Sequence, residues 1–293
     1  MLSRAPTARR ALARRLIAAP HLVPNRTLSQ QPDTEAQLVR TDAGLTFLDL
    51  ARPAAKNALS VALVDRLRAL VEDVRFDGTT RALVLRSAVP GAFCAGADLK
   101  ERKGMSQLQV ARFLYNLRRL LGELADLPVP TIAAIDGPAL GGGLELALAC
   151  DLRVAGSTVT KLGLPETRLA IIPGAGGTQR LSRLVGVSRA KDLIFRAKVL
   201  DAREALEAGV ISYVSREGQS ASDKAEELVM EMLQAGPLAL RAAKVAIDVG
   251  AEADLESGLD VERLAYQTIL QTEDRLEGLR AFAEKRKPVY EGR

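Results

Sequence analysis

The sequence is poor in the side chains that many enzymes use for nucleophilic and metal chemistry. It has one histidine, His21, two cysteines, Cys94 and Cys150, and no tryptophan. No histidine therefore remains beyond position 21 for a Ser-His-Asp triad, a Cys-His dyad or a histidine-ligated zinc site. Acid–base chemistry in the body of the chain must fall to carboxylates, lysine or tyrosine.

Long apolar runs and a cysteine framework are also missing. No stretch approaches the roughly 20 apolar residues that span a membrane, so membrane insertion is not expected. The two cysteines stand 56 positions apart, and one pair does not make a disulfide framework, so we expect reduced thiols. Cys94 is expected to be a small packing residue rather than a nucleophile, because free cysteine is commonly buried.

Acidic residues are absent from the first 32 positions, which contain six arginines. An arginine-rich, acid-free stretch with hydroxyl residues is typical of a mitochondrial transit peptide, so we assign residues 1–32 to one and expect a mitochondrial matrix location. A basic arm that binds nucleic acid is the alternative. The rest of the chain holds 35 basic and 36 acidic side chains, so the net charge of +5 comes from the leader.

Along the body of the chain, stretches with the apolar pattern of strands alternate with stretches that have the apolar spacing of helices. Short apolar runs predict strands at residues 45–50, 82–85, 131–135 and 152–155. Helical spacing covers residues 60–74, where Ser60 can cap the helix, and residues 110–124. After about Gly218 the strands cease, and the chain is expected to be helical from Ala221 to Lys287 with a break at Gly236-Pro237. This alternation favours an α/β class.

Two glutamates beside glycine-rich backbone are the strongest chemical signal. Glu145 follows Gly141-Gly142-Gly143 at an expected helix start, and Glu166 comes 21 residues later. If the N–H groups of Ala97 and Gly142 point at one spot, they form a two-donor oxyanion hole for the enolate of a thioester. The two carboxylates then form a general acid–base pair for hydration. Such a reaction needs no cofactor and no metal.

Each of these features alone also has a plain structural explanation. Most runs of three glycines are turns, and a single helical glutamate is normally a solvated surface residue. The run Pro173-Gly174-Ala175-Gly176-Gly177 resembles a phosphate loop. It lacks the Gly-Lys-Ser/Thr ending of a nucleotide-binding P-loop, so nucleotide hydrolysis is not expected.

Four motifs, in this order, resemble the enoyl-CoA hydratase/isomerase (crotonase) family. They lie at residues 93–101, 130–137, 141–151 and 172–181, and the likeness runs from about Val39 to Arg293. The resemblance implies a crotonase-like spiral of ββα units, with the active site, over residues 36–218. It further implies a C-terminal helical region over residues 219–293 that drives assembly into trimers or dimers of trimers.

The resemblance also implies roles for individual residues. The oxyanion donors match the backbones of Ala97 and Gly142, and the hydratase glutamates match Glu145 and Glu166. Many relatives that isomerise or cleave acyl-CoA lack one of these glutamates, so the presence of both favours hydration. The residues expected to contact the CoA part of the acyl-CoA substrate are Lys56, Ala95, Ala97, Lys100, Phe282 and Lys285.

Within the family, the strings around Cys94, Leu164-Pro165-Glu166 and Glu284-Lys285-Arg286 are most similar to hydratases of 3-methylglutaconyl-CoA in leucine breakdown. Short-chain enoyl-CoA hydratases of fatty-acid oxidation usually carry glutamine where Leu164 stands, and they form the first alternative. A catalytically silent homologue is disfavoured, because both glutamates and both glycine runs are present.

Binding to RNA is the alternative of another class. The 3-methylglutaconyl-CoA hydratases are also known as binders of AU-rich RNA, a property attributed to a lysine-rich first helix. The matching stretch here, residues 60–74, has no lysine and carries two arginines against three acidic residues. Phosphate binding needs an excess of positive charge, so RNA binding is not expected.

Overall fold

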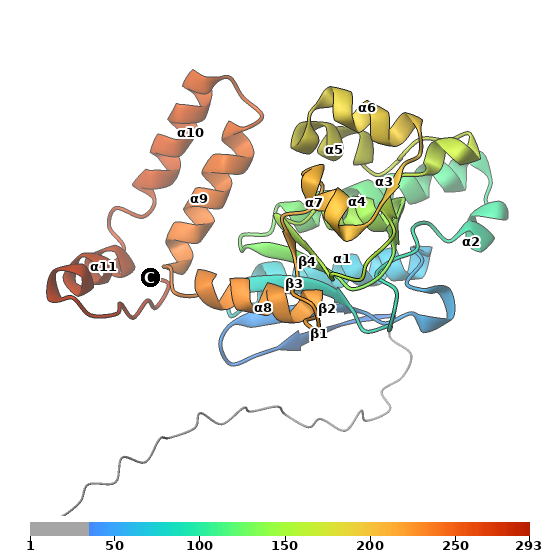
Figure 1. Ribbon diagram of the computed structural model, residues 1–293. Coiled ribbons are helices and arrows are strands. Elements are labelled where there is room, and N and C mark those ends of the chain that lie inside the picture. Colours follow the sequence, from blue (N-terminus) through green and yellow to red (C-terminus); the bar gives the residue numbers. More distant parts are fainter. Residues whose placement is uncertain (1–34) are drawn as a thin grey trace, which may run out of the picture. The chain divides into compact units, whose positions relative to one another are not determined.

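A computed structural model describes residues 35–293 (Figure 1). The predicted transit peptide, residues 1–32, lies outside the described residues. Within them, one sheet has six strands in the order β1-β2-β3-β4-β6-β9, and a smaller sheet has three in the order β5-β7-β8. The strands are β1 (Ala36–Arg40), β2 (Leu45–Leu50), β3 (Ala82–Ser87), β4 (Thr131–Ile135), β5 (Ala139–Leu140), β6 (Leu152–Ala155), β7 (Leu162–Gly163), β8 (Val199–Leu200) and β9 (Tyr213–Val214).

The four predicted strands are confirmed as β2, β3, β4 and β6, which lie side by side in the large sheet. All neighbours in this sheet are parallel except β1, which pairs antiparallel with β2. Parallel strands are buried on both faces, and this explains their uninterrupted apolar runs. The two-residue strands β5, β7, β8 and β9 were not predicted, because two residues cannot show a period.

Helices cover both faces of the large sheet. The helices and 3₁₀ turns are η1 (Pro53–Ala55), α1 (Val61–Phe76), α2 (Leu99–Lys103), α3 (Gln107–Ala125), α4 (Gly142–Leu148), η2 (Glu166–Leu169), α5 (Gly177–Val185), α6 (Val187–Phe195), α7 (Ala202–Glu207), α8 (Ala221–Met232), α9 (Pro237–Gly250), α10 (Leu255–Gln267) and α11 (Glu273–Glu284). Helix α1 starts where predicted, and its Leu63 N–H donates to the Ser60 hydroxyl at 3.1 Å.

Successive side chains of β3 show how the sheet divides the core. Leu83 and Leu85 belong to the main core with the apolar faces of α1, α3 and α4. Ala82 and Val84 point to the opposite face, where Leu228 and other residues of α8 cover them. This alternation follows from the two-residue period of a strand. The main core includes residues of α3 and α4. Both helices also contribute residues to the walls of the candidate site.

The C-terminal helices are divided more often than the sequence predicts. Breaks follow α9 and α10 in addition to the predicted break at Gly236-Pro237. Two capping side chains explain them: Asp254 accepts a hydrogen bond from the Ser257 N–H at 3.1 Å, and Thr272 accepts one from the Arg275 N–H at 3.2 Å. Such caps begin a new helix wherever the preceding residue leaves the helical conformation.

Helices α9 and α10 form a pair that extends away from the large sheet, and α11 follows at its base (Figure 1). Lys244 ties α9 to the body, since its Nζ lies 2.8 Å from Asp151 Oδ2. No residue of α9 or α10 is buried, and large apolar side chains such as Leu255 (79% exposed) and Phe282 of α11 (86% exposed) face outward. None of the described helices is long and apolar enough to cross a membrane.

Candidate active site

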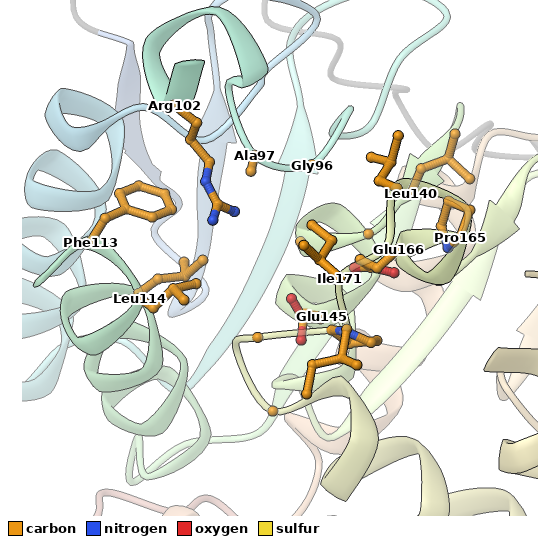
Figure 2. Close-up of a pocket in the computed structure, with 18 of the residues that line it drawn as sticks. Gly96, Ala97, Arg102, Phe113, Leu114, Leu140, Glu145, Pro165, Glu166 and Ile171 are labelled. Carbon is orange, nitrogen blue, oxygen red and sulfur yellow. The ribbon is translucent and has the colours of Figure 1, made fainter. Parts of the chain in front are cut away.

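A cavity of about 900 Å³ lies between α3, the 95–97 loop and the segment that carries Glu166 (Figure 2). Its walls are largely apolar, and the Ala95, Ala97, Gly142, Glu145 and Glu166 of the sequence prediction all line it. The apolar lining residues are Leu99, Val110, Phe113, Leu114, Leu117, Leu140, Leu169, Ile171 and Ile172. A cavity of this kind suits a small-molecule ligand with an apolar body and a few polar groups.

Backbone pairing brings the two loops of the predicted oxyanion hole together. The Leu59 N–H donates to the Gly96 carbonyl at 2.7 Å, and the Asp98 N–H donates back to the Leu59 carbonyl at 3.0 Å. The Leu140 N–H donates to the Cys94 carbonyl at 3.3 Å. These bonds hold the 94–98 segment against Leu59, just before α1, on one side and against β5 on the other.

The N–H groups of Ala97 and Gly142 lie at the junction of these loops. A Cβ atom placed on Gly142 would lie 3.6 Å from the Ala97 nitrogen, so the two backbones are neighbours. Among the backbone hydrogen bonds of residues 35–293, none is donated by either N–H. Gly141, at φ 52° and ψ −124°, turns the chain into α4 in a conformation that side chains with a Cβ disfavour. Both residues line the cavity, and within residues 35–293 neither N–H has an acceptor.

Glu145 is held by the glycine-rich segment that resembles a phosphate loop. Its Oε1 accepts hydrogen bonds from the N–H groups of Ala175 and Gly177, both at 2.8 Å. The side chain is only 3% exposed. Burial raises the pKa of Glu145, whereas the two N–H donors and the charges of Arg180 and Arg118 oppose that rise. The 173–177 run therefore orients a carboxylate of the same chain.

Glu166 shares the cavity but has fewer partners. It begins the 3₁₀ turn η2, and its Oε2 is buried without a hydrogen-bond partner in the described part of the chain. Burial raises the pKa of Glu166 to about 7, and the nearby charge of Glu145 adds to that rise. Both protonation states of this carboxyl are therefore populated near neutral pH.

Cys94 lies behind the oxyanion loop and is fully buried. Its Sγ donates to the Asn57 carbonyl at 3.0 Å, and burial raises the pKa of the thiol to about 12. A thiol of this kind is not ionised at neutral pH and is a poor nucleophile. The expectation that Cys94 is a packing residue is confirmed, and both cysteines are free thiols, as expected.

The other predicted CoA contacts lie outside the cavity wall of the described chain. Lys56 is next to it, because the Ala95 N–H donates to the Lys56 carbonyl at 3.1 Å, but the Lys56 side chain is exposed. Lys100 is exposed on α2. Phe282 and Lys285 lie at the end of α11 and do not line the cavity of their own chain. Their contacts with CoA stay predictions.

Sequence reasoning missed three features of the site. Two arginines, Arg102 of α2 and Arg118 of α3, line the cavity. The third is the pair of N–H donors that hold Glu145. Arg102 lies only five residues after Ala97, and this spacing could have indicated that it lies near the site. Arginines on short surface helices are common, however, so the spacing alone does not identify it. No group of three or more potential metal-ligating side chains occurs among residues 35–293.

Comparisons with known proteins agree with this geometry. The sequence profile of the enoyl-CoA hydratase/isomerase family matches residues 40–293. The Homo sapiens protein named methylglutaconyl-CoA hydratase, mitochondrial, is 52% identical over 277 residues, which are 92% of this chain and 81% of that protein. The Arabidopsis thaliana protein named probable enoyl-CoA hydratase 2, mitochondrial, is 51% identical over 87% of this chain and 84% of its own length.

A solved structure extends the likeness to three dimensions. The crystal structure of an enoyl-CoA hydratase from Bacillus anthracis superposes with a TM-score of 0.86 at 45% sequence identity, covering 89% of this chain and all of that chain. The predicted crotonase-like α/β fold with C-terminal helices is thereby confirmed. From the family profile, the similar relatives and the shared fold together, it follows that this chain belongs to the enoyl-CoA hydratase/isomerase family.

Proposed function

We propose that the protein is a hydro-lyase that adds water across the α,β double bond of an enoyl-CoA thioester, with 3-methylglutaconyl-CoA as its substrate. One observation carries the proposal: Glu145, Glu166 and the unpaired N–H groups of Ala97 and Gly142 converge on a single cavity. The substrate follows from the relative at 52% identity that is named for it.

In this proposal, Ala97 and Gly142 hold the thioester. Their N–H groups donate to its carbonyl oxygen, which withdraws electron density from the double bond and makes the β-carbon electrophilic. When water adds there, the electron pair of the double bond moves toward the carbonyl and produces an enolate. The two donors stabilise that oxyanion, and removing one donor of this kind typically costs about 3 kcal/mol.

Glu145 acts as the general base and Glu166 as the general acid. The backbone donors on Oε1 favour the ionised form of Glu145, so its carboxylate can take a proton from the water that attacks the β-carbon. A pKa of about 7 keeps Glu166 partly protonated, so it can deliver a proton to the α-carbon of the enolate. After the addition Glu145 holds a proton and Glu166 is ionised, and proton exchange with solvent water returns both to their starting states, with no cofactor beyond the CoA of the substrate.

The remaining parts of the proposal concern CoA and assembly. Ala95 of the cavity wall and the exposed Lys56 and Lys100 contact CoA of the same chain. The exposed Phe282 and Lys285 contact CoA bound to a neighbouring subunit. The outward apolar residues of α9–α11 support self-association into a trimer or a dimer of trimers. The relatives named as mitochondrial support a mitochondrial matrix enzyme.

The test is a turnover assay of the full chain with 3-methylglutaconyl-CoA and crotonyl-CoA, followed by loss of enoyl-thioester absorbance. Higher kcat/KM for 3-methylglutaconyl-CoA is expected. A higher value for crotonyl-CoA would favour the second candidate, a short-chain enoyl-CoA hydratase, which the apolar cavity walls also accommodate. If neither thioester were hydrated, the proposal would be wrong.

A further inference from the structure

Arg102 is a cation in the cavity wall that the hydration chemistry above does not use. Its side chain is half-buried and extends from α2 into the cavity beside Phe113 (Figure 2). The guanidinium carbon lies 5.9 Å from the centre of the Phe113 ring. Within residues 35–293, no carboxylate forms an ion pair with Arg102, and its side chain donates no hydrogen bond. Its five N–H donors are therefore free to bind a ligand.

The short helix that carries Arg102 is anchored firmly beside the oxyanion loop. Asp98 caps α2 by accepting from the Lys100 and Glu101 N–H groups, and it forms an ion pair with Arg52 at 2.8 Å. Glu101 Oε2 accepts from the Val61 N–H at 3.1 Å, which ties α2 to the start of α1. The contacts fix the backbone of Arg102 close to Ala97, the proposed donor to the thioester carbonyl.

The other arginines near the site are placed differently. Arg118, the second arginine of the cavity wall, is exposed, and its Nε donates to the Leu114 carbonyl at 3.2 Å. Arg180 donates to the carbonyls of Ala175 and Leu121 behind the Glu145 loop. On α2 itself, the neighbouring cation Lys103 is exposed and does not line the cavity. Arg102 alone combines partial burial, a free guanidinium and an orientation into the cavity.

We propose that Arg102 binds the second carboxylate of a dicarboxylic acyl group and selects 3-methylglutaconyl-CoA over neutral enoyl thioesters. The proposal rests on the proposed function above. A 3-methylglutaconyl group ends in a carboxylate a short carbon chain beyond the thioester carbonyl. Burying that charge among Phe113, Leu114 and Ile171 is costly unless it is paired. The planar fork of arginine matches a carboxylate with two parallel hydrogen bonds.

The test compares 3-methylglutaconyl-CoA with 3-methylcrotonyl-CoA, which lacks only the distal carboxylate. Arg102→Met should lower kcat/KM for 3-methylglutaconyl-CoA by roughly 100-fold, mainly through KM, because it removes one partner of a buried charge pair. The value for 3-methylcrotonyl-CoA should change by less than about threefold, since no charge is left unpaired. Arg102→Lys should fall between wild type and Arg102→Met, because lysine keeps the charge without the fork.

Lys103→Met is the matched control, as it removes an exposed cation from the same helix and should leave both substrates unaffected. An equal loss for both substrates in Arg102→Met would overturn the proposal, since it would assign Arg102 to CoA phosphates or to structure. No loss for either would overturn it as well. If wild type hydrated only 3-methylcrotonyl-CoA, the substrate assignment and the role of Arg102 would both fail. If it hydrated neither thioester, the hydratase proposal itself would fail.

Discussion

The regions around the two glutamates differ although both carboxyls line one cavity. Glu145 lies in the first turn of α4, and two backbone N–H groups from the 173–177 segment hold one of its oxygens. Glu166 begins a short 3₁₀ turn, and one of its oxygens is buried without a partner in the described chain. Both residues are glutamates, but the backbone that surrounds one carboxyl differs from the backbone that surrounds the other.

This difference indicates how one fold can run acid and base chemistry with a single residue type. Hydrogen bonds to an ionised carboxylate stabilise its charge, whereas burial without partners favours the protonated acid. Glu145 is buried, but hydrogen bonds to its carboxylate partly offset the rise in its pKa. Glu166 is affected mainly by burial, which raises its pKa to about 7. The proposed assignment of base and acid rests on this contrast.

Replacing either carboxyl by an amide should have the largest effect. Glu145→Gln and Glu166→Gln should each lower kcat by about 10²–10⁴-fold, because each removes a general acid–base group. Both amides keep the shape of the side chain, so the dissociation constant of a CoA thioester should change little. Steady-state kinetics and calorimetric titration measure the two quantities. A variant that kept more than about a tenth of wild-type kcat would lose the role proposed for its residue.

Displacing Glu145 without changing it should also impair turnover. A Cβ atom on Gly177 would lie 2.9 Å from Glu145 Oε1 and 2.9 Å from Pro173 Cβ, so Gly177→Ala must shift the carboxylate or the loop. Because small misplacements of catalytic groups are costly, kcat should fall by roughly 100-fold. Steady-state kinetics of the purified variant measures this loss.

Gly122→Ala is the control for that substitution, because a Cβ on Gly122 meets no atom within 4 Å in the interior of α3. This variant should be as active as wild type and slightly more stable, by about 0.5–1 kcal/mol. Wild-type kcat in Gly177→Ala would show that the two backbone donors do not need to hold Glu145 in its observed position.

The pH dependence should separate the roles of the two carboxyls. If Glu166 is the acid, hydration needs its protonated form, so kcat/KM should fall about tenfold per pH unit above a pH near 7. Initial rates measured from about pH 5 to about pH 9 should show this limb, and Glu166→Gln should lack it. Activity that instead rose with pH through 7 would reverse the assignment of acid and base.

The smallest expected effect is on stability. The folded protein holds the Glu166 proton more tightly than the unfolded chain, since the pKa is raised from 4.5 to about 7. Its contribution to stability is therefore fully present below about pH 4.5 and is lost as pH rises through 7. Between those limits, the free energy of unfolding of Glu166→Gln should gain up to about 3 kcal/mol relative to wild type, because each pKa unit corresponds to about 1.4 kcal/mol.

Urea unfolding at about pH 5 and about pH 8 measures this gain. Glu217→Gln, which removes an exposed carboxylate from a loop, is the control and should track wild type at both values. A constant difference between Glu166→Gln and wild type across this range would mean that Glu166 titrates normally in the folded protein.

Much of the architecture was predictable from local pattern. Strands β2, β3, β4 and β6, the Ser60 cap of α1 and the helix start after Gly141 follow from apolar spacing and capping chemistry that act within a few residues. The two-residue strands carry too little local signal to be predicted, and the Asp254 cap lies inside a stretch that the sequence predicts to be one continuous helix. The family motifs identified Glu145, Glu166, Ala97 and Gly142 as candidate site residues. No local pattern indicated which hydrogen bonds the two carboxyl groups would form.

The sequence by itself determined the chemical inventory: carboxylates in place of histidines, bare glycine backbone beside them, and an α/β alternation that leads to a parallel sheet. Tertiary structure alone decided that the 173–177 segment orients Glu145, that Glu166 has a pKa of about 7, and that Arg102 faces the cavity. The reason is physical, because desolvation and hydrogen bonding at these groups depend on segments far away along the chain, which become neighbours only after folding.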